Sequence, residues 1–283
     1  MTKRDRSTLK TFFADGTLPT AEHYRDLIDS GVNQIEDGFE KPAEEGLKLK
    51  SLSGRHTLMS FYRGIGAGLP VWRLAHGDEM GTLEFQRGPG GRDVSLDAPD
   101  NVEEDLETPG LSLDRDGRVG VYTSTPEWRL DVEGVARMRG RVGYPGPGVT
   151  IPADGRWHPI TETLTGCHIL EVVAGAGAAE GAGRYSLLHA TAMNAFNPRN
   201  PVINWLFSRR SIRRQTAMYG SYADRLRLRW VAMPGPHAYR LELRTNSNFG
   251  DDYIVRYYVT RLWFDTQMEG ARLNGPPRDQ DVT

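Results

Sequence analysis

The stretch that most constrains the fold is residues 112–140, which combine many turn and strand signals with very little apolar surface. Residues 116–117, Asp-Gly, predict a tight turn because glycine adopts positive φ without steric cost. Residues 119–122 alternate at strand period, Pro126 interrupts the run, and alternation restarts over 130–132. An isolated hairpin of this size is marginal in water. We therefore expect it to pair with neighbouring copies, either along the chain or from other chains.

The order and spacing of these residues also resemble a known element. DGRVGV (116–121), TSTP (123–126) and RLDVEG (129–134) are similar to the shaft element of trimeric phage tail fibres and related adhesins. The resemblance implies that three chains wind together and close a small three-fold β-prism. Tyr122 and Trp128 depart from the pattern because they are bulkier than the usual residues. The alternative is a plain surface hairpin in an unrelated β protein.

The first 40 residues predict one amphipathic helix after a turn-rich lead-in. Thr20 can cap the helix, and Gly38 is expected to end it. His23 is expected to face solvent. Apolar residues recur at helical spacing and form one stripe: Tyr24, Leu27, Ile28, Gly31 and Ile35. An isolated helix cannot bury such a stripe on itself, so we expect it to dock on another protein or on its copies.

A second resemblance concerns the same segment. LKTFF (9–13), PT (19–20) and LIDS (27–30) resemble the opening of tail fibres from phages and contractile injection systems, where this segment attaches the fibre to the baseplate. The alternative is an unrelated globular domain that begins with a helix. With the stripe, the resemblance implies a baseplate-attachment site formed by Phe12, Phe13, Tyr24, Leu27, Ile28 and Ile35.

Residues 41–143 are predicted to form β structure with little apolar core. Short apolar runs of strand length at 47–49, 58–62, 71–74 and 82–85 are separated by glycine-rich turns. The acidic stretch 93–107 is expected to be a solvated loop. We interpret the whole region as an intertwined trimeric β shaft or neck.

The sequence pattern changes after residues 140–152, where the apolar runs become longer. Longer alternating runs predict an antiparallel β-sandwich of jelly-roll type over 144–272, large enough to have its own core. The glycine- and alanine-rich stretch 174–183 is expected to be a flexible loop at one end, and 273–283 a flexible tail. The expected strands cover 169–173, 185–190, 202–207, 226–231, 239–243 and 254–264. The fold class is therefore mainly β, with a short N-terminal helix, a shaft and a sandwich tip.

Several chemistries find no support in the sequence. Cys167 is the single cysteine and is expected to be a buried structural thiol. The seven histidines form no HExxH or HxH motif, although His168 and His189 lie on strands that could be neighbours. Phosphate-loop, dinucleotide-binding and nucleophile-elbow motifs are missing. We therefore predict no cofactor, no metal and no enzymatic activity. No apolar window approaches a membrane span, and no secretory signal is visible.

The basic residues of the last region suggest a binding surface. Residues 144–272 hold 15 arginines against 10 acidic residues. The densest run is short and lies among strands, and the pI is about 6.4, which disfavours nucleic acid. Arginine forks and tyrosine rings suit an anionic glycan or lipopolysaccharide, although a solvated strand face and a packed sandwich edge are alternatives. The predicted receptor-binding residues are Arg209, Arg210, Arg213, Arg214, Tyr219 and Tyr222.

These observations lead to one functional hypothesis. We expect a homotrimeric tail-fibre-like protein, assembled in the cytoplasm into an extracellular particle, which binds baseplate proteins through its N-terminus and a cell-surface glycan through its tip. No nucleic acid and no membrane insertion are expected. The alternatives are a fibre-tip enzyme that cleaves glycan, and a baseplate-decorating protein without a receptor.

Overall fold

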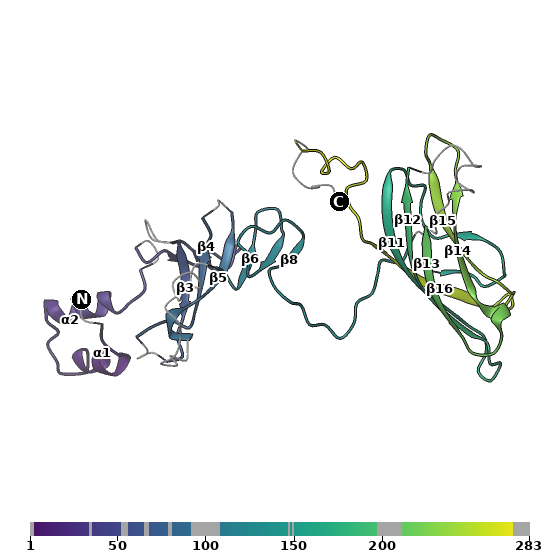
Figure 1. Ribbon diagram of the computed structural model, residues 1–283. Helices are drawn as coiled ribbons and strands as arrows, with labels where there is room; N and C mark the ends of the chain where they lie inside the picture. The colour runs from purple at the N-terminus through teal and green to yellow at the C-terminus, as the bar shows by residue number, and fades with distance from the viewer. Residues whose placement is uncertain are drawn as a thin grey trace, which may run out of the picture. The chain divides into compact units, whose positions relative to one another are not determined.

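A computed structural model describes residues 3–33, 36–51, 56–64, 68–78, 81–91, 108–146, 148, 150–196 and 211–273. Backbone contacts divide the chain into two units, residues 1–137 and 138–283, and each is described by itself (Figure 1). The division lies close to the boundary expected at 143–144. Strands dominate both units, which confirms the mainly β fold class.

Unit 1 begins with two short helices, α1 (Arg6–Phe12) and α2 (Ala21–Asp29). The Asp5 carboxylate caps α1 by accepting a hydrogen bond from the Thr8 N–H at 2.8 Å. Thr20 caps α2 as predicted: its hydroxyl accepts a hydrogen bond from the His23 N–H, and the His23 ring accepts one from the Thr20 N–H. The turn-rich lead-in expected over 15–19 lies between the two helices, whereas α1 was not predicted. One expectation was wrong here: α2 ends at Asp29, long before Gly38.

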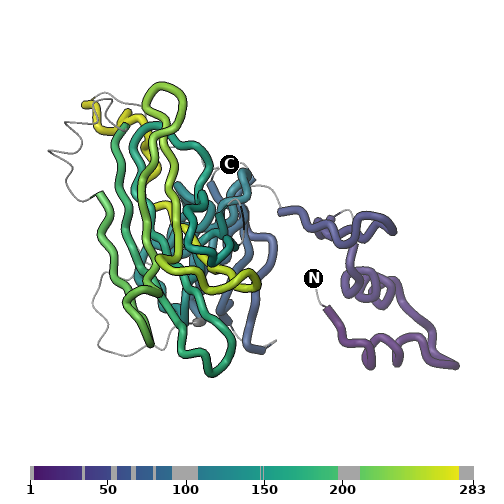
Figure 2. The backbone as a smooth tube through the Cα atoms, turned by 90° about the vertical axis from the view of Figure 1, so that its right-hand side faces the viewer, coloured from purple at the N-terminus to yellow at the C-terminus, as the bar shows by residue number. Residues whose placement is uncertain are grey.

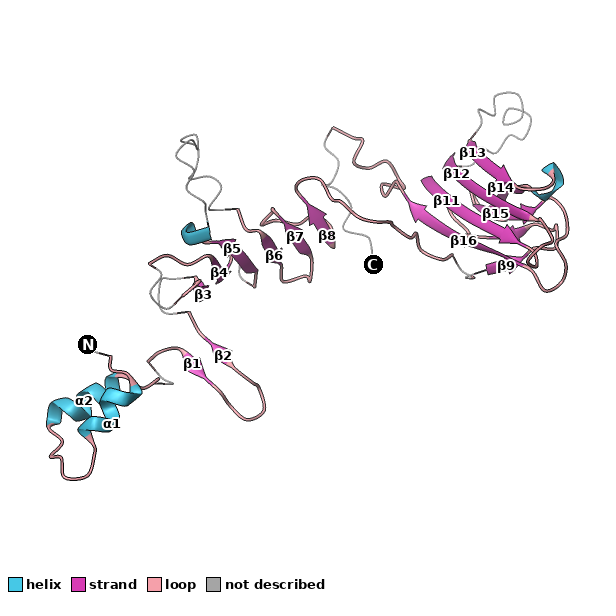
Figure 3. Ribbon diagram, turned by 90° about the horizontal axis from the view of Figure 1, so that it is seen from below, coloured by secondary structure: helices cyan, strands magenta, loops and turns pink. Residues whose placement is uncertain are grey.

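A single six-stranded sheet forms the rest of unit 1, after a small hairpin of β1 (Phe39–Glu40) and β2 (Lys48–Leu49) (Figure 3). Its strands follow chain order: β3 (Thr57–Phe61), β4 (Trp72–His76), β5 (Leu83–Arg87), β6 (Leu111–Leu113), β7 (Val119–Val121) and β8 (Leu130–Val132). Neighbours pair antiparallel except β7 and β8, which are parallel. The strands expected over 119–122 and 130–132 are present as β7 and β8, but they pair parallel and therefore do not form the expected hairpin. The predicted turn at 116–117 joins β6 and β7 instead, and residues 122–129 are a crossover.

Unit 2 is an antiparallel β-sandwich. One sheet has the order β13-β12-β11-β16-β9 and the other has the order β10-β15-β14. The long strands run side by side in Figure 2, where unit 2 is coloured teal to yellow. Their bounds are β9 (Thr150–Pro152), β10 (His158–Pro159), β11 (Cys167–Gly177), β12 (Tyr185–Ala195), β13 (Ile212–Met218), β14 (Leu226–Ala232), β15 (Tyr239–Thr245) and β16 (Ile254–Arg261). Side chains from both sheets share one core, including Val172, Leu188, Leu228, Leu243 and Tyr257.

The strand pairing is close to that of a jelly roll. The first and last strands of unit 2 pair (β9 with β16), as do the second and seventh (β10 with β15) and the fourth and fifth (β12 with β13). The third strand, β11, pairs with β12 as a hairpin, whereas a regular jelly roll would place it beside β14. Long hairpin strands of 11 residues each favour this local pairing.

The hairpin also corrects one prediction about loops. The stretch 174–183 was expected to be a loop, but β11 continues through Gly177, so the first four residues belong to the sheet. Gly175 faces the Leu187 side chain, where a Cβ would be 3.2 Å from it. The glycines and alanines therefore permit close cross-strand packing. The expected strand at 202–207, the acidic stretch 93–107 and most of the 273–283 tail lie outside the described residues.

Candidate functional site

The helical hairpin of unit 1 brings two of the predicted attachment residues, Phe13 and Tyr24, into contact. Phe12 stacks on the His23 ring with centroids 4.1 Å apart and planes at 8°, so His23 does not face solvent freely as expected. Phe13 meets the edge of Tyr24 at 5.3 Å. Asp26 is buried and accepts a 3.1 Å ion pair from Arg4, which ties the chain start to α2.

The two helices leave part of the apolar stripe uncovered. The exposed fractions of Tyr24, Leu27 and Ile28 are 52%, 43% and 74%. Three such side chains on nine helical residues form a small apolar surface on the α2 side of the hairpin. Ile35, the last predicted member, lies outside the described residues. The hairpin could therefore dock through α2 while α1 supports it from behind.

The six-stranded sheet has two chemically different faces. The register aligns one apolar row across every strand, because Leu74 pairs with Phe85, Phe85 with Leu111, and Leu111 with Val121. The flanking rows on the same face are mostly apolar, with Arg87 opposite Trp72 and His76 opposite Leu83 as the exceptions. We call this the apolar face, and its members are Met59, Phe61, Trp72, Leu74, Leu83, Phe85, Leu111, Leu113, Val119, Val121, Leu130 and Val132.

The opposite face carries small and polar residues, and the 122–129 crossover lies over it. The Ser112 hydroxyl, fully buried, donates a 2.6 Å hydrogen bond to the Thr123 carbonyl. A Cβ at Gly120 would overlap that hydroxyl and that carbonyl, so only glycine permits the crossover to approach the sheet so closely. Because the crossover occupies the polar face, the apolar face stays open.

Within the described residues, the apolar face has no partner layer. Every member of the chain's hydrophobic core cluster belongs to residues 151–257. Met59, Phe61 and Trp72 are 39–42% exposed, and Leu130 is 64% exposed. A sheet buries one face against another layer in stable domains. In a single chain, none of the described residues forms a layer over the apolar face of this sheet.

In unit 2, the two predicted arginines that the structure describes lie on a strand. Arg213 and Arg214 belong to β13, so their side chains leave opposite faces of the sheet. Arg209 and Arg210 lie outside the described residues. A groove of about 300 Å³ runs along β12 and β13 at this place. Its lining is His189, Ala190, Thr191, Arg213, Arg214 and Gln215.

An ion-pair cluster stands beside this groove. Glu171 accepts a 3.0 Å hydrogen bond from the His189 ring and pairs with Arg141, which arrives from the segment before the sandwich. The hydrogen bond from His189, helped by the charge of Arg141, lowers the pKa of Glu171. The pair fixes where the chain enters unit 2, and neither Arg213 nor Arg214 of the groove has an ion pair with another described residue.

The predicted tyrosines are not part of the groove. Tyr219 and Tyr222 lie in the connection from β13 to β14, with exposed fractions of 78% and 69%. The five-residue step from Arg214 to Tyr219 along an extended chain spans about 17 Å. The structure therefore separates the tyrosines from the arginines. Tyr219 instead meets the edge of Tyr185 at the hairpin end of β11 and β12.

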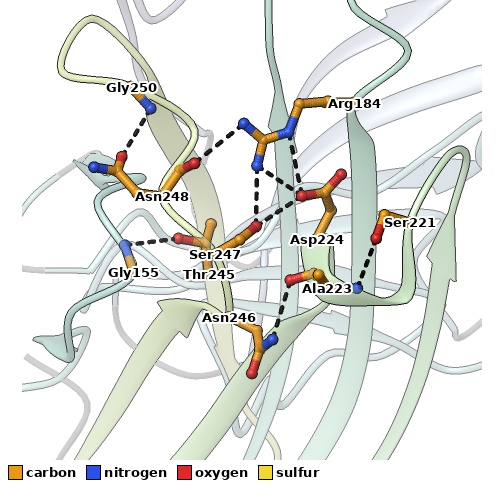
Figure 4. A network of polar contacts seen from close by, with 10 residues as sticks. All are labelled: Gly155, Arg184, Ser221, Ala223, Asp224, Thr245, Asn246, Ser247, Asn248 and Gly250. Atoms are coloured by element: carbon orange, nitrogen blue, oxygen red, sulfur yellow. Dashed lines mark hydrogen bonds and ion pairs between the residues drawn. The ribbon is translucent and has the colours of Figure 1, made fainter.

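A buried ion pair holds the tyrosine-bearing connection in place (Figure 4). The Arg184 guanidinium donates to Asp224 Oδ1 at 2.7 Å and lies 4.2 Å from the centroid of the Phe249 ring. Ser247 Oγ donates to the same carboxylate oxygen at 2.7 Å. The hydrogen bond from Arg184 lowers the pKa of Asp224 and keeps it ionised. The connection is thus anchored to β12 and to the loop after β15.

The tyrosine end is remote from the place where the chain enters the sandwich. Arg141 binds Glu171 near the start of β11, whereas Tyr219 hydrogen-bonds Tyr185 at the far end of the same hairpin. Glu171 and Gly177 are six steps apart along β11, or about 20 Å. We call the tyrosine end the distal end of unit 2, because it is the end of the hairpin away from Arg141.

The histidine pair and the thiol provide no second site. His168 is 3% exposed and faces Asn194, whereas His189 pairs with Val173 on the outer face, so they do not approach each other as the sequence allowed. Cys167 is buried, as predicted, and burial raises its pKa. In the part of the chain that the structure describes, no cluster of acidic, cysteine and histidine side chains is arranged to hold a metal.

One cationic surface was not predicted from the sequence. Strands β14 and β15 carry arginines on their outer face, and the RLRLR run at 225–229 was interpreted as the solvated side of a half-buried strand. The strand pairing that brings Arg244 opposite Arg227 is not visible in the sequence.

No protein-family model matches this chain, and no curated protein matches it either. None of the helices among the described residues is both long and apolar enough to span a membrane.

Proposed function

We propose that this protein is a homotrimeric, fibre-like attachment protein, with an N-terminal docking hairpin, a shaft and a glycan-binding tip. The observation that carries the proposal is the apolar face of the six-stranded sheet. It offers twelve apolar side chains on one side, and none of the described residues forms a layer over them.

Copies of the same chain are the occupant that best fits this face. Burying a Val, Leu or Phe side chain contributes roughly 1.5–3 kcal/mol, and these side chains are already half-buried, so each gains on the order of 1 kcal/mol. Summed over the face, this is enough to offset the cost of association. Three sheets arranged about an axis would bury all three faces, in agreement with the fibre resemblance of residues 116–134.

The other two parts have matching roles in this proposal. The exposed side of α2 is the surface through which the hairpin joins a baseplate protein, because Leu27 and Ile28 need a partner to be buried. Unit 2 folds around its own core and presents Tyr219 and Tyr222 on an anchored connection at its distal end. Three tips on one rigid shaft raise the effective concentration of weak sites.

Light scattering after size-exclusion chromatography tests the trimer. The full chain is expected to elute at three times its 31.6 kDa mass at micromolar concentration. The double variant Phe85→Asp/Leu111→Asp, which places charges on the apolar face, is expected to dissociate. Ser60→Asp, on the opposite face and exposed, is the matched control and should stay trimeric. A wild-type mass of one chain would overturn the proposal.

Two further measurements separate the roles. Deleting residues 1–40 should leave the trimer intact and abolish incorporation into the particle. Whole-cell binding by the full trimer, without release of soluble saccharide, distinguishes a binding tip from a glycan-cleaving enzyme. Release of sugar fragments would overturn the non-enzymatic assignment while leaving the trimer unaffected.

A further inference from the structure

Five arginines share one face of unit 2. On the outer side of β14 and β15, Arg227 pairs with Arg244 in register, and Arg229 pairs with Glu242. Arg225 and Arg240 extend the same face toward its two ends. We call Arg225, Arg227, Arg229, Arg240 and Arg244 the arginine track. Glu242 is the one acid that β14 and β15 place on this face, so five positive charges and one negative leave an excess of four.

Two aromatic rings hold this track in place. The guanidinium carbons of Arg229 and Arg244 lie 4.3 and 4.6 Å from the Trp157 ring centroid. The Arg225 guanidinium lies 4.1 Å from the Tyr222 ring centroid. Cation–π contacts of this kind orient a guanidinium without neutralising it. The track is therefore preorganised and keeps its charge.

Glu242 neutralises one end of the track. Its two oxygens accept bonds from Arg229 and Arg240, both at 2.7 Å. Burial favours a raised pKa for this carboxyl, but the bonds from the two arginines outweigh burial, and the pKa is lowered. Arg229 and Arg240 are thus committed to an acid within the chain.

The other end has no such acid. Among the described residues, Arg225, Arg227 and Arg244 form no ion pair, and their Nε atoms are buried without a hydrogen-bond partner. Like charges directly opposite each other on paired strands are destabilising. An anion placed between Arg227 and Arg244 would remove this repulsion.

We propose that the arginine track binds a polyanionic polysaccharide, with one sulfate, phosphate or carboxylate group seated between Arg227 and Arg244. The proposal rests on the proposed receptor-binding role and supplies its ligand class and its surface. The track from Arg225 to Arg229 extends over about 13 Å, long enough to contact several sugar units. It begins at Tyr222, so it continues from the distal tyrosine end. Arginine suits this ligand because its planar fork is weakly hydrated and matches oxyanions.

Dextran sulfate and uncharged dextran are the probes, because they share a backbone and differ in charge. The full chain is expected to bind dextran sulfate, to bind dextran undetectably, and to lose affinity as salt is added. Arg227→Gln/Arg244→Gln should weaken binding by about tenfold or more, the loss of a charge-assisted contact. The matched control Arg256→Gln/Arg261→Gln removes the same charge from exposed positions of β16 in the other sheet and should change affinity by less than about twofold.

Footprinting of the wild type does not depend on a folded variant. An arginine-selective reagent followed by mass spectrometry should show that dextran sulfate protects Arg227 and Arg244 and leaves Arg256 and Arg261 reactive. Equal losses in the two double variants, or protection of the control pair instead, would overturn the proposal. Tighter binding of single-stranded DNA than of dextran sulfate would overturn the polysaccharide assignment. The mass of the trimer is independent of all three outcomes.

Discussion

Replacing Asp224 by Asn tests whether the ion pair of Figure 4 supports unit 2. The Asp224 side chain is 5% exposed, whereas that of Arg184 is 31% exposed. Removing one member of a buried pair costs about 3–5 kcal/mol. Here water can reach Arg184 and replace part of the interaction, which lowers the expected loss in the free energy of unfolding to about 2 kcal/mol. For a unit of this size, that loss corresponds to a drop in Tm of about 6–8 °C.

Calorimetry of the full chain measures this shift, and hydrogen exchange of peptides from β11 and β12 assigns the transition to unit 2. Asp116→Asn is the control, because Asp116 is 55% exposed and its ion pairs with Arg115 and Arg118 are 4.0 and 3.8 Å long. Exposed pairs contribute about 0–1 kcal/mol, so the control should leave Tm almost unchanged. If Asp224→Asn shifts Tm no more than the control does, the pair does not hold the tyrosine-bearing connection.

Three further results are expected. Gly120→Ala should destabilise unit 1 by about 1–3 kcal/mol in denaturant titrations, because its methyl group would overlap the crossover, whereas Gly140→Ala, with open space around it, should be neutral. The pKa of Glu242 is lowered, so the stability that this carboxylate contributes is present above its ordinary pKa of 4.5 and is lost as the pH falls through the lowered pKa. A Glu242→Gln variant should therefore show a flatter acid limb in a plot of the free energy of unfolding against pH. Cys167 should react with a thiol reagent at pH 8 only as fast as unit 2 unfolds, and rapid labelling of the native chain would contradict its burial.

Local patterns predicted the strands well where burial differs between the two faces. In β14, the buried residues Leu226 and Leu228 alternate with Arg227 and Arg229, and the alternation alone identified a half-buried strand. Thr20 predicted the start of a helix because its hydroxyl accepts a hydrogen bond from a backbone N–H only three residues away. Both signals come from residues that are close together in the sequence, so the sequence alone predicts them.

Partners that lie far apart in sequence were not predictable in this way. The parallel pairing of β7 and β8 needs a crossover, and the crossover contacts Ser112 of β6 through a hydrogen bond that the sequence does not reveal. The basic run at 209–214 looked like one cluster, but strand geometry sends Arg213 and Arg214 to opposite faces. Helix α1 was missed because seven residues carry too little periodicity, and its one clear signal is the Asp5 cap.

The two units bury their apolar residues by different means, and this difference links fold to proposed function. Unit 2 closes two sheets over Leu188, Leu243 and Tyr257, which are almost fully buried within one chain. Unit 1 aligns Phe85 and Leu111 with ten other apolar side chains on one open face, while its buried positions hold small or polar residues. A chain that evolved to fold alone would place those apolar residues on the face that the crossover covers. Their placement on the uncovered face makes sense if other copies complete the layer. The sandwich needs no such help and is left with its outer surfaces, including the arginine track, available for a ligand.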